Sequence, residues 1–327
     1  MCALFGIHDY GDCFTNRQKN IIMAVLSQEC ETRGTDATGI AYVKNDKTQV
    51  FKRPFPAHRM RYNIPAKVKT VMGHTRMTTQ GTEKKNCNNH PFFGRVKNNT
   101  FALAHNGILH NDIDIRKTMK LPKTSIETDS YIAVQLIEQE NSISFDSLQK
   151  VAETVRGSFV FTVLDKHDNL YFVRGDNPIC VYHFADKGFY LYASTEEILQ
   201  KSLVRLGIDK WYRHRVPIDT GDILRIDNTG DIDKSKFKVV EYYQTHLYGY
   251  YPHHEYDYGW SIVPGKNNSD EYEQYVMMLK QTAQMYGYTP ADVDDLLAEG
   301  FTPEEIEEMI YCGDIYENEI IYQRVGG

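Results

Sequence analysis

The chain opens with Met1-Cys2-Ala3-Leu4-Phe5-Gly6-Ile7, and the cysteine at its second position decides how the fold is interpreted. If the initiator methionine is removed, Cys2 carries a thiol and a free α-amine. An α-amine has a reference pKa of about 8, so it can accept the thiol proton directly or through a water. Cys2 can then supply both a nucleophile and its base. The alternative is a small buried residue in the first strand, the commoner place for a cysteine.

Four polar segments interrupt the apolar runs downstream, and each follows or closes a strand-like stretch. Loops that carry an active site on a rigid scaffold have this arrangement. The segments are Arg33-Gly34-Thr35-Asp36, Gly73-His74-Thr75-Arg76-Met77-Thr78-Thr79-Gln80-Gly81, Ala104-His105-Asn106-Gly107 and Glu127-Thr128-Asp129.

The four segments contain the groups that hydrolysis of a small zwitterionic amide such as glutamine requires. Such a reaction needs donors for the oxyanion, a cation for the substrate carboxylate and an anion for its ammonium group. Asn106 offers a side-chain N–H, and Gly107 offers a main-chain N–H. Arg76 offers a guanidinium for the carboxylate, and Asp129 offers a carboxylate for the ammonium.

The order and separation of these motifs resemble the class II glutamine amidotransferase domain, which is an N-terminal-nucleophile hydrolase. The resemblance covers roughly residues 2–240, about three quarters of the chain, and implies an α+β fold with a four-layer αββα sandwich. It rests on Met1-Cys2 with Ala3-Leu4-Phe5-Gly6, the Arg33-Gly34 loop, Gly73-His74-Thr75-Arg76, His105-Asn106-Gly107 and Thr128-Asp129.

The resemblance implies a role for each residue around the nucleophile. Cys2 matches the nucleophile, and its α-amine matches the base. Asn106 and Gly107 match the oxyanion hole, and Arg33 matches the arginine that steadies the surroundings of the nucleophile. Ala3 stands where many members have glycine. The resemblance implies neither a metal nor another cofactor.

The resemblance also implies how the substrate is held. Arg76, Thr79 and Gln80 fall where the family binds the glutamine α-carboxylate, and Asp129 falls where it holds the α-amino group. Gln80 replaces a frequent histidine, but its amide can still donate to a carboxylate. Met77 stands where some members have an aromatic residue on a closing loop, so we expect a looser seal against water.

Composition places the chain among globular proteins. Its 327 residues are 41% hydrophobic, which suits one large or two modest domains. It lacks both a run of eighteen apolar residues and the basic and apolar regions of a signal peptide, so we expect a cytoplasmic protein without a membrane span. The six cysteines are scattered, and although Cys87 and His90 have a ligand-like spacing, no second pair lies nearby. We therefore expect reduced thiols and no zinc.

Negative charge is concentrated near the C-terminus. Residues 281–323 contain eleven Asp and Glu and no Lys or Arg, so this stretch has a formal charge of −11. The net charge of the whole chain is −7. The remainder carries +4 and has no basic stripe of the kind that binds nucleic acid.

Hydrophobic spacing and capping residues predict the main helices and strands. Asp129 raises an alternative, because its carboxylate could cap the following helix instead of holding a ligand. The predicted elements are a helix capped by Thr15 and ended by Arg33-Gly34, a hairpin of 39–43 and 49–53 turning at Asn45-Asp46, helices over 131–137 and 144–155, strands at 158–164, 170–174, 179–184 and 189–193, a helix opened by the capping box Ser194-Thr195-Glu196-Glu197, and strands at 223–226 and 237–241.

The C-terminal part differs in composition from the rest. Residues 242–258 contain seven tyrosines and form either an aromatic docking surface or a linker packed on the first domain. After a helix over 270–286, two units at 288–300 and 301–313 each place Thr at the N-cap, Pro at N1 and Gly past the end. Helices this short must pack on the preceding helix or on a partner. We predict a glutaminase domain over 2–241, a linker over 242–268 and an acidic helical extension over 269–327.

These observations predict an enzyme that hydrolyses L-glutamine to glutamate and ammonia. The segment after Glu241 is too short for a synthetase, phosphoribosyl-binding or sugar-isomerase domain and lacks a phosphate-binding glycine loop, so we expect the ammonia acceptor on a separate protein. Two alternatives remain open: an N-terminal-cysteine amidohydrolase acting on another amide, and a catalytically idle homologue acting as a binding or regulatory module. Retention of Met1 would favour the second, because Cys2 would then lack a free amine.

Overall fold

The computed structural model describes residues 2–239, 276–277, 279–280, 283–284 and 288–301, together with residues 303, 306 and 310. The chain divides into two compact units, Met1–His246 and Leu247–Gly327. The tyrosine-rich segment 242–258 lies outside the described residues. The domain boundaries given above stay predictions.

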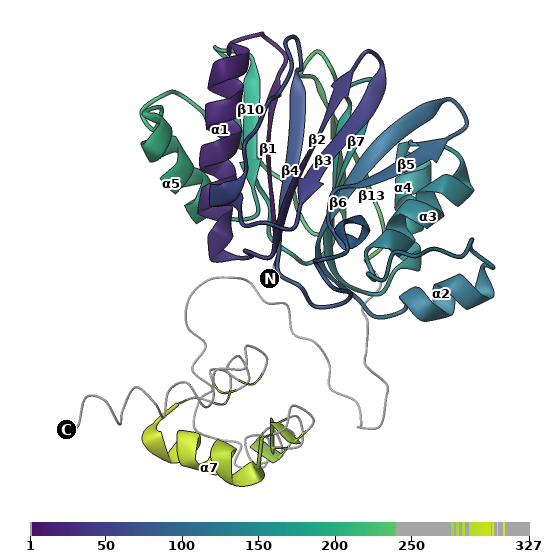
Figure 1. The fold of residues 1–327 in the computed structure, drawn as a ribbon, viewed down its shortest axis with the longest axis vertical. Helices are drawn as coiled ribbons and strands as arrows, with labels where there is room; N and C mark the ends of the chain where they lie inside the picture. Colours follow the sequence, from purple (N-terminus) through teal and green to yellow (C-terminus); the bar gives the residue numbers. More distant parts are fainter. Residues whose placement is uncertain are drawn as a thin grey trace. The chain divides into compact units, whose positions relative to one another are not determined.

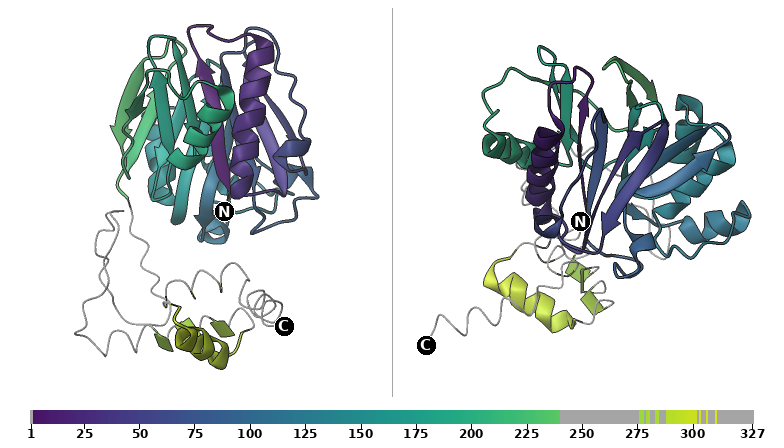
Figure 2. Two further views of the ribbon diagram at one scale, coloured as in Figure 1. Left: turned by 90° about the vertical axis from the view of Figure 1, so that its left-hand side faces the viewer. Right: turned by 45° about the horizontal axis from the view of Figure 1, so that its top comes forward.

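The first unit consists of two antiparallel sheets packed face to face, with helices on both outer faces (Figures 1 and 2). This confirms the predicted α+β fold of four αββα layers. The seven-stranded sheet has the order β11-β9-β10-β1-β4-β2-β3, with β1 (Ala3–Asp9), β2 (Ala37–Lys44), β3 (Lys47–Arg53), β4 (Thr70–Arg76), β9 (Cys180–Phe184), β10 (Phe189–Ala193) and β11 (His214–Val216). The six-stranded sheet has the order β13-β12-β8-β7-β6-β5, with β5 (Phe92–Val96), β6 (Asn99–Leu109), β7 (Gly157–Asp165), β8 (Leu170–Arg174), β12 (Asp222–Ile226) and β13 (Ile232–Lys236).

The helices cover the two sheets from outside. α1 (Asn16–Glu29) and α5 (Glu196–Leu206) lie on the seven-stranded sheet, and α3 (Tyr131–Glu140) and α4 (Phe145–Thr154) lie on the six-stranded sheet (Figure 1). A short helix that the sequence did not predict, α2 (Asp112–Thr118), follows β6. Three single turns, η1 (Cys30–Thr32), η2 (Ala57–Arg59) and η3 (Asn86–Asn88), lie in the connections.

Strand β1 is buried on both faces because it lies between two cores. Phe5 and Ile7 belong to the cluster beneath α1 and α5, whereas Leu4 belongs to the cluster between the sheets, together with Ala102 and Ala104 of β6. Successive side chains of a strand alternate between faces. Leu4 therefore faces the other sheet, whereas Phe5 and Ile7 face the helices.

Local signals in the sequence place several elements as predicted. The Thr15 side chain accepts a hydrogen bond from the Gln18 main-chain N–H, and the Gln18 side chain bonds back to Thr15, which confirms the cap of α1. Ser144 caps α4 in the same way. Asn45 and Asp46 take positive φ angles of 52° and 54° at the turn of the β2–β3 hairpin, a conformation that Asn and Asp tolerate.

The capping box predicted at Ser194 is wrong. Thr195 is the N-cap of α5, and its side chain accepts from the Ile198 N–H. The Ser194 hydroxyl instead accepts a hydrogen bond of 2.8 Å from the Leu4 N–H of β1. A long-range partner therefore displaced the local capping pattern.

The strand predicted at 237–241 is wrong in its described part. The last strand is β13, which pairs with β12 through Asp222↔Lys236 and ends before the predicted range. Its residues are mostly exposed and polar, so it lacks the apolar alternation that marks a strand in a sequence. Phe237 follows the strand, is buried, and donates its N–H to Gly221 O at 2.9 Å.

The second unit contains α7 (Pro290–Glu299), which begins and ends as predicted. Thr289 is its N-cap, Pro290 is its first residue, and Gly300 ends it in a left-handed conformation with φ of 101°. α7 packs on residues before and after it in the chain, so the described residues of the two similar segments 288–300 and 301–313 share one core. That core contains Leu279, Ala283, Tyr288, Val293, Leu296, Ile306 and Ile310. Across the described part of the chain, none of the helices combines the length and apolar character that a membrane span requires.

One buried ion pair ties α1 to the first strand. Lys19 Nζ lies 2.8 Å from an Asp9 carboxylate oxygen, with exposed side-chain fractions of 4% and 0%, and it also donates to Val68 O at 2.7 Å. Removing one partner of such a pair leaves a buried charge without compensation, which costs far more than the pair itself is worth.

We therefore expect Lys19→Met to lower the free energy of unfolding by about 3–5 kcal/mol, because Asp9 stays buried without its cation. Lys201→Met is the matched control: it removes an exposed ion pair with Glu197 one turn away and is expected to cost less than about 0.5 kcal/mol. Urea denaturation of both variants measures the difference. Equal losses in the free energy of unfolding would show that burial of the Lys19–Asp9 pair does not increase the cost of removing the lysine.

Candidate active site

Cys2 immediately precedes β1, the central strand of the seven-stranded sheet, and lies beside the end of β4. The register pairs Ala3 with Thr75, so Cys2 faces the residues that follow. Its Sγ lies 3.5 Å from Met77 O and accepts from the Met77 N–H at 3.4 Å. Burial raises the pKa of the Cys2 thiol, although the Met77 bond and the Arg76 charge oppose the shift. The resting thiol is therefore protonated and needs a base to become a nucleophile.

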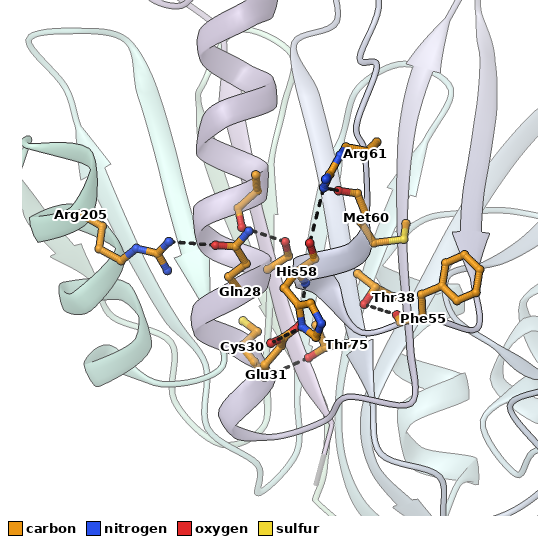
Figure 3. Close-up of polar contacts among 12 residues, drawn as sticks. Gln28, Cys30, Glu31, Thr38, Phe55, His58, Met60, Arg61, Thr75 and Arg205 are labelled. Carbon is orange, nitrogen blue, oxygen red and sulfur yellow. Dashed lines mark hydrogen bonds and ion pairs between the residues drawn. The ribbon is translucent and has the colours of Figure 1, made fainter.

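The loop that follows η1 holds the main chain of Cys2 in place. Arg33 Nε donates to Cys2 O at 3.0 Å. The Thr75 hydroxyl of β4 ties η1 down by donating to Cys30 O at 3.1 Å (Figure 3). A Cβ on Gly34 would lie 2.5 Å from the Arg76 carbonyl carbon, so only glycine lets the loop approach this closely. Arg33 thus contacts Cys2, as the sequence led us to expect, but its role stays a prediction.

Arg76 is buried, and its guanidinium holds the loop that follows β4. Nη1 donates to Asn89 Oδ1 at 2.7 Å, and Nη2 donates to Gln80 O at 2.6 Å and to Gly81 O at 2.9 Å. Three of the five N–H groups of the guanidinium are thus used by neutral oxygens. Two remain for a ligand, so the fork shown here is engaged mainly with its own loop.

Asp129 is buried and bonded to neutral donors. Its carboxylate accepts from the Leu109 N–H at 2.6 Å and from the Ser130 hydroxyl at 3.3 Å, and its own N–H donates to Gln80 Oε1 at 3.2 Å. α3 begins at Tyr131 with Ser130 at the N-cap, without a side-chain capping bond. The alternative in which Asp129 caps this helix is therefore wrong.

Asn106 carries a donor that the protein does not use. It is 1% exposed, and its Nδ2 finds no hydrogen-bond partner within the described structure. A buried donor without a partner costs about 1–3 kcal/mol, so such atoms commonly mark a site for a ligand or water. The next residue, Gly107, has φ of +142°, and a Cβ there would lie 2.0 Å from Ser158 O. The backbone thus requires glycine at position 107.

One small pocket gathers most of the predicted site. Six of the eight predicted residues line it, whereas Asn106 and Arg33 do not. The predicted residues in the wall are Cys2, Arg76, Thr79, Gln80, Gly107 and Asp129, and the others are Met77, His90, His105, Thr128 and Ser130.

Two of three neighbouring buried histidines, His90 and His105, line the pocket, which the sequence did not predict. The His90 ring lies 4.2 Å from the His74 ring and 6.5 Å from the His105 ring, measured between centroids. Both His90 nitrogens have no partner among the described residues. Burial lowers the pKa of all three, to about 3 for His74, so the rings are neutral. No cluster of at least three His, Cys, Asp or Glu with metal-binding geometry occurs in the described part of the chain.

Comparison with known proteins identifies the domain. A protein-family model described as "Glutamine amidotransferase domain" matches residues 74–201. The chain carries a class II glutamine amidotransferase domain. It is 26% identical over 251 residues to glutamine–fructose-6-phosphate aminotransferase of Fusobacterium nucleatum, covering 73% of this chain and 38% of that enzyme. It is also 26% identical over 212 residues to 7-cyano-7-deazaguanine synthase of Sulfolobus acidocaldarius, covering 60% of this chain and 44% of that enzyme.

A solved structure shares the fold of the amidotransferase domain. The glutamine phosphoribosylpyrophosphate amidotransferase of B. subtilis superposes with a TM-score of 0.57 and 19% identity, over 72% of this chain and 49% of that one. The chain thus spans less than half the length of each of these three proteins.

The neutral histidines make the stability of the amidotransferase domain depend on pH. His74 has a folded-state pKa of about 3 and an unfolded value of about 6.5, so the unfolded state binds more protons between these values. The free energy of unfolding is therefore complete above pH 6.5 and falls as the pH drops toward 3. We expect His74→Gln to reduce this slope by up to about 1.4 kcal/mol per pH unit.

Urea denaturation at a series of pH values between 4 and 7 measures the slope. His167→Gln is the control, because His167 is exposed in the turn between β7 and β8. A slope that is the same in His74→Gln and in the wild type would show that His74 does not couple folding to proton binding.

Proposed function

We propose that the chain hydrolyses L-glutamine to glutamate and ammonia once Met1 has been removed. The observation that carries the proposal is the buried and unpartnered Nδ2 of Asn106 next to the pocket of Cys2. This donor supports the proposal, because a preorganised N–H group can stabilise an oxyanion, and donors of this kind supply a large part of the acceleration of acyl transfer. The names of two of the similar proteins also contain glutamine.

The chemistry follows from the two groups of Cys2. The α-amine takes the thiol proton, and the sulfur attacks the γ-carboxamide carbon of glutamine. The oxyanion of the tetrahedral intermediate accepts hydrogen bonds from Asn106 Nδ2 and Gly107 N–H. The C–N bond then breaks, the protonated amine gives its proton to the departing ammonia, and a γ-glutamyl thioester remains. Water attacks the thioester, releases glutamate and restores the thiol.

The charges of the pocket favour a free amino acid over another amide. Arg76 supplies the positive charge, with Thr79 and Gln80 beside it, for the α-carboxylate. Asp129 supplies the negative charge for the α-ammonium. An amide that lacks either pole would leave one of these buried charges without compensation, which binding sites discriminate against strongly. This pairing supports glutamine over an unrelated amide substrate.

We expect Asn106→Ala to lower kcat for glutamine hydrolysis by about 100- to 1000-fold with little change in thermal stability, because its Nδ2 has no partner to lose within the described structure. Cys2→Ala is expected to abolish activity. The measurement is glutamate released by protein whose processed N-terminus has been checked by mass spectrometry.

Asn111→Ala is the matched control. Asn111 Nδ2 donates to Thr154 O at 3.0 Å outside the pocket, so its loss is expected to lower stability and leave kcat unchanged. Glutamate release by Cys2→Ala equal to that of the wild type would exclude the mechanism. Retained Met1 together with no activity would favour the idle binding module.

We also propose that a separate protein accepts the ammonia and docks on the acidic C-terminal unit. Asp295 and Glu299 lie exposed on α7, and the surrounding stretch carries a formal charge of −11. A partner with a basic surface would be drawn to this charge.

Neutralising the two residues in the full chain, with Asp295→Asn and Glu299→Gln, is expected to reduce recovery of the partner from the native host while glutaminase activity stays unchanged. Glu197→Gln on α5 is the control for loss of an exposed acidic charge on the first unit. Quantitative pulldown compares the three proteins. Recovery of the same proteins at equal yield would contradict docking through the acidic helix.

A further inference from the structure

We propose that Asn177 is a positioning residue that orients the Asn106–Gly107 peptide, whose N–H stabilises the oxyanion. The inference rests on the proposed function and adds to it a residue that lies outside both the predicted site and the pocket wall. Asn177 Nδ2 donates to Asn106 O at 3.0 Å. In the sequence, Asn177 and Pro178 look like an ordinary turn.

The loop that carries Asn177 crosses from one sheet to the other, and hydrogen bonds hold the two residues before Asn177 in place. It connects β8 of the six-stranded sheet to β9 of the seven-stranded sheet. The Gly175 N–H donates to Phe159 O at 2.9 Å, and the Phe159 N–H donates to Asp176 Oδ1 at 2.9 Å. Pro178 restricts the preceding residue to an extended conformation. The Asn177 side chain is thus held against β6 rather than left in solvent.

A hydrogen bond to Asn106 O acts directly on the next N–H. The Asn106 carbonyl and the Gly107 N–H belong to one planar trans peptide and point in opposite directions. A donor that fixes the carbonyl therefore fixes the direction of the N–H. It also polarises the peptide, which strengthens the N–H as a donor.

The pairing of β6 directs the Gly107 N–H away from β7. The ladder continues through His110 N–H to Arg156 O at 2.8 Å, and pairs that exchange hydrogen bonds alternate with pairs that do not. By this alternation Gly107 and Phe159 form a pair that does not exchange hydrogen bonds. On its other side β6 pairs with β5 only as far as Leu103 among the described strands. The N–H consequently faces the pocket that Gly107 lines.

Glycine at position 107 is also what lets Asn177 approach. A Cβ there would lie 2.7 Å from Asn177 Nδ2, closer than a side chain tolerates. The left-handed backbone at Gly107, with φ of +142°, needs support because it departs from a regular strand. Asn177 provides that support at the residue whose orientation matters for the reaction.

Kinetics of the full-length processed protein test the inference. We expect Asn177→Ala to lower kcat for glutamine hydrolysis about 10-fold, less than loss of a donor itself, with KM changed less than about 2-fold. Binding of a γ-aldehyde analogue of glutamine, which forms a tetrahedral adduct with Cys2, should weaken in parallel with kcat. Asn169→Ala is the control, because its Nδ2 bonds to Asp165 at the opposite end of β8.

A second readout does not depend on activity. Asn106–Gly107 is the only Asn-Gly pair in the sequence, so labelling with 13C-carbonyl Asn and 15N-Gly isolates the Gly107 amide resonance. We expect this resonance to move in Asn177→Ala and to stay in place in Asn169→Ala. Asn177→Asp keeps the size of the side chain and replaces the donor with an acceptor, so it takes the place of the alanine variant if that variant does not fold.

The outcomes separate this inference from the proposed function. Active wild type with an Asn177 variant within about 2-fold in kcat overturns the role of Asn177 and leaves glutamine hydrolysis standing. A 10-fold loss in kcat with an unchanged KM and a shifted Gly107 resonance supports it. Equal losses in Asn177→Ala and Asn169→Ala would mark a structural effect and overturn it. Wild type that releases no glutamate removes the proposed function, and the inference falls with it.

Discussion

The burial of β1 in the middle of the seven-stranded sheet is the constraint on which the site depends. All seven residues of β1 are buried, and the strand pairs with β4 on one side and β10 on the other. Chain termini usually fray because nothing holds them. Here the Ser194 hydroxyl accepts from the Leu4 N–H, and Arg33 holds the Cys2 carbonyl. The second residue of the chain therefore has a fixed position beside the end of β4.

The burial of β1 also explains why its fourth residue, Gly6, is a glycine. A Cβ on Gly6 would lie 2.4 Å from Val71 O and 2.5 Å from the Tyr192 ring. Tyr192 is fully buried between the sheets, where it packs edge-on against Phe172 at 4.9 Å between ring centroids. Glycine in the first strand thus lets one large side chain join the two sheets. β1 is thus enclosed within the sandwich, and Cys2 lies at the N-terminal end of that strand.

How far the sequence predicts the structure depends on how far apart the interacting residues lie in the chain. The Thr15 and Ser144 caps and the Asn45-Asp46 turn involve partners within a few residues, and these predictions are confirmed. The capping box at Ser194 failed because its hydroxyl bonds to Leu4, 190 positions away. The pattern of a cap was present, but the competing partner could not be seen in the local sequence.

The site shows the same division. Residue types, motif order and the family resemblance predicted six of the eleven residues that line the pocket, because these signals can be recognised in the sequence itself. The sequence did not predict the engagement of Arg76 with its own loop, the wall that includes His90, or the bond from Asn177 to Asn106. Each of these depends on which strands become neighbours. Asn177 in particular looks like a turn residue, since Asn before Pro is typical of turns.

The two charges of the pocket are arranged so that they do not neutralise each other. Among the described residues no ion pair joins Arg76 to Asp129, and each is surrounded by neutral dipoles: carbonyls and an amide around Arg76, an N–H and a hydroxyl around Asp129. A direct ion pair would satisfy both charges and close the pocket to a zwitterion. Dipoles stabilise each charge without cancelling it, so both fields still act on a ligand. Under the proposed function, a ligand with one carboxylate and one ammonium group pairs with both charges.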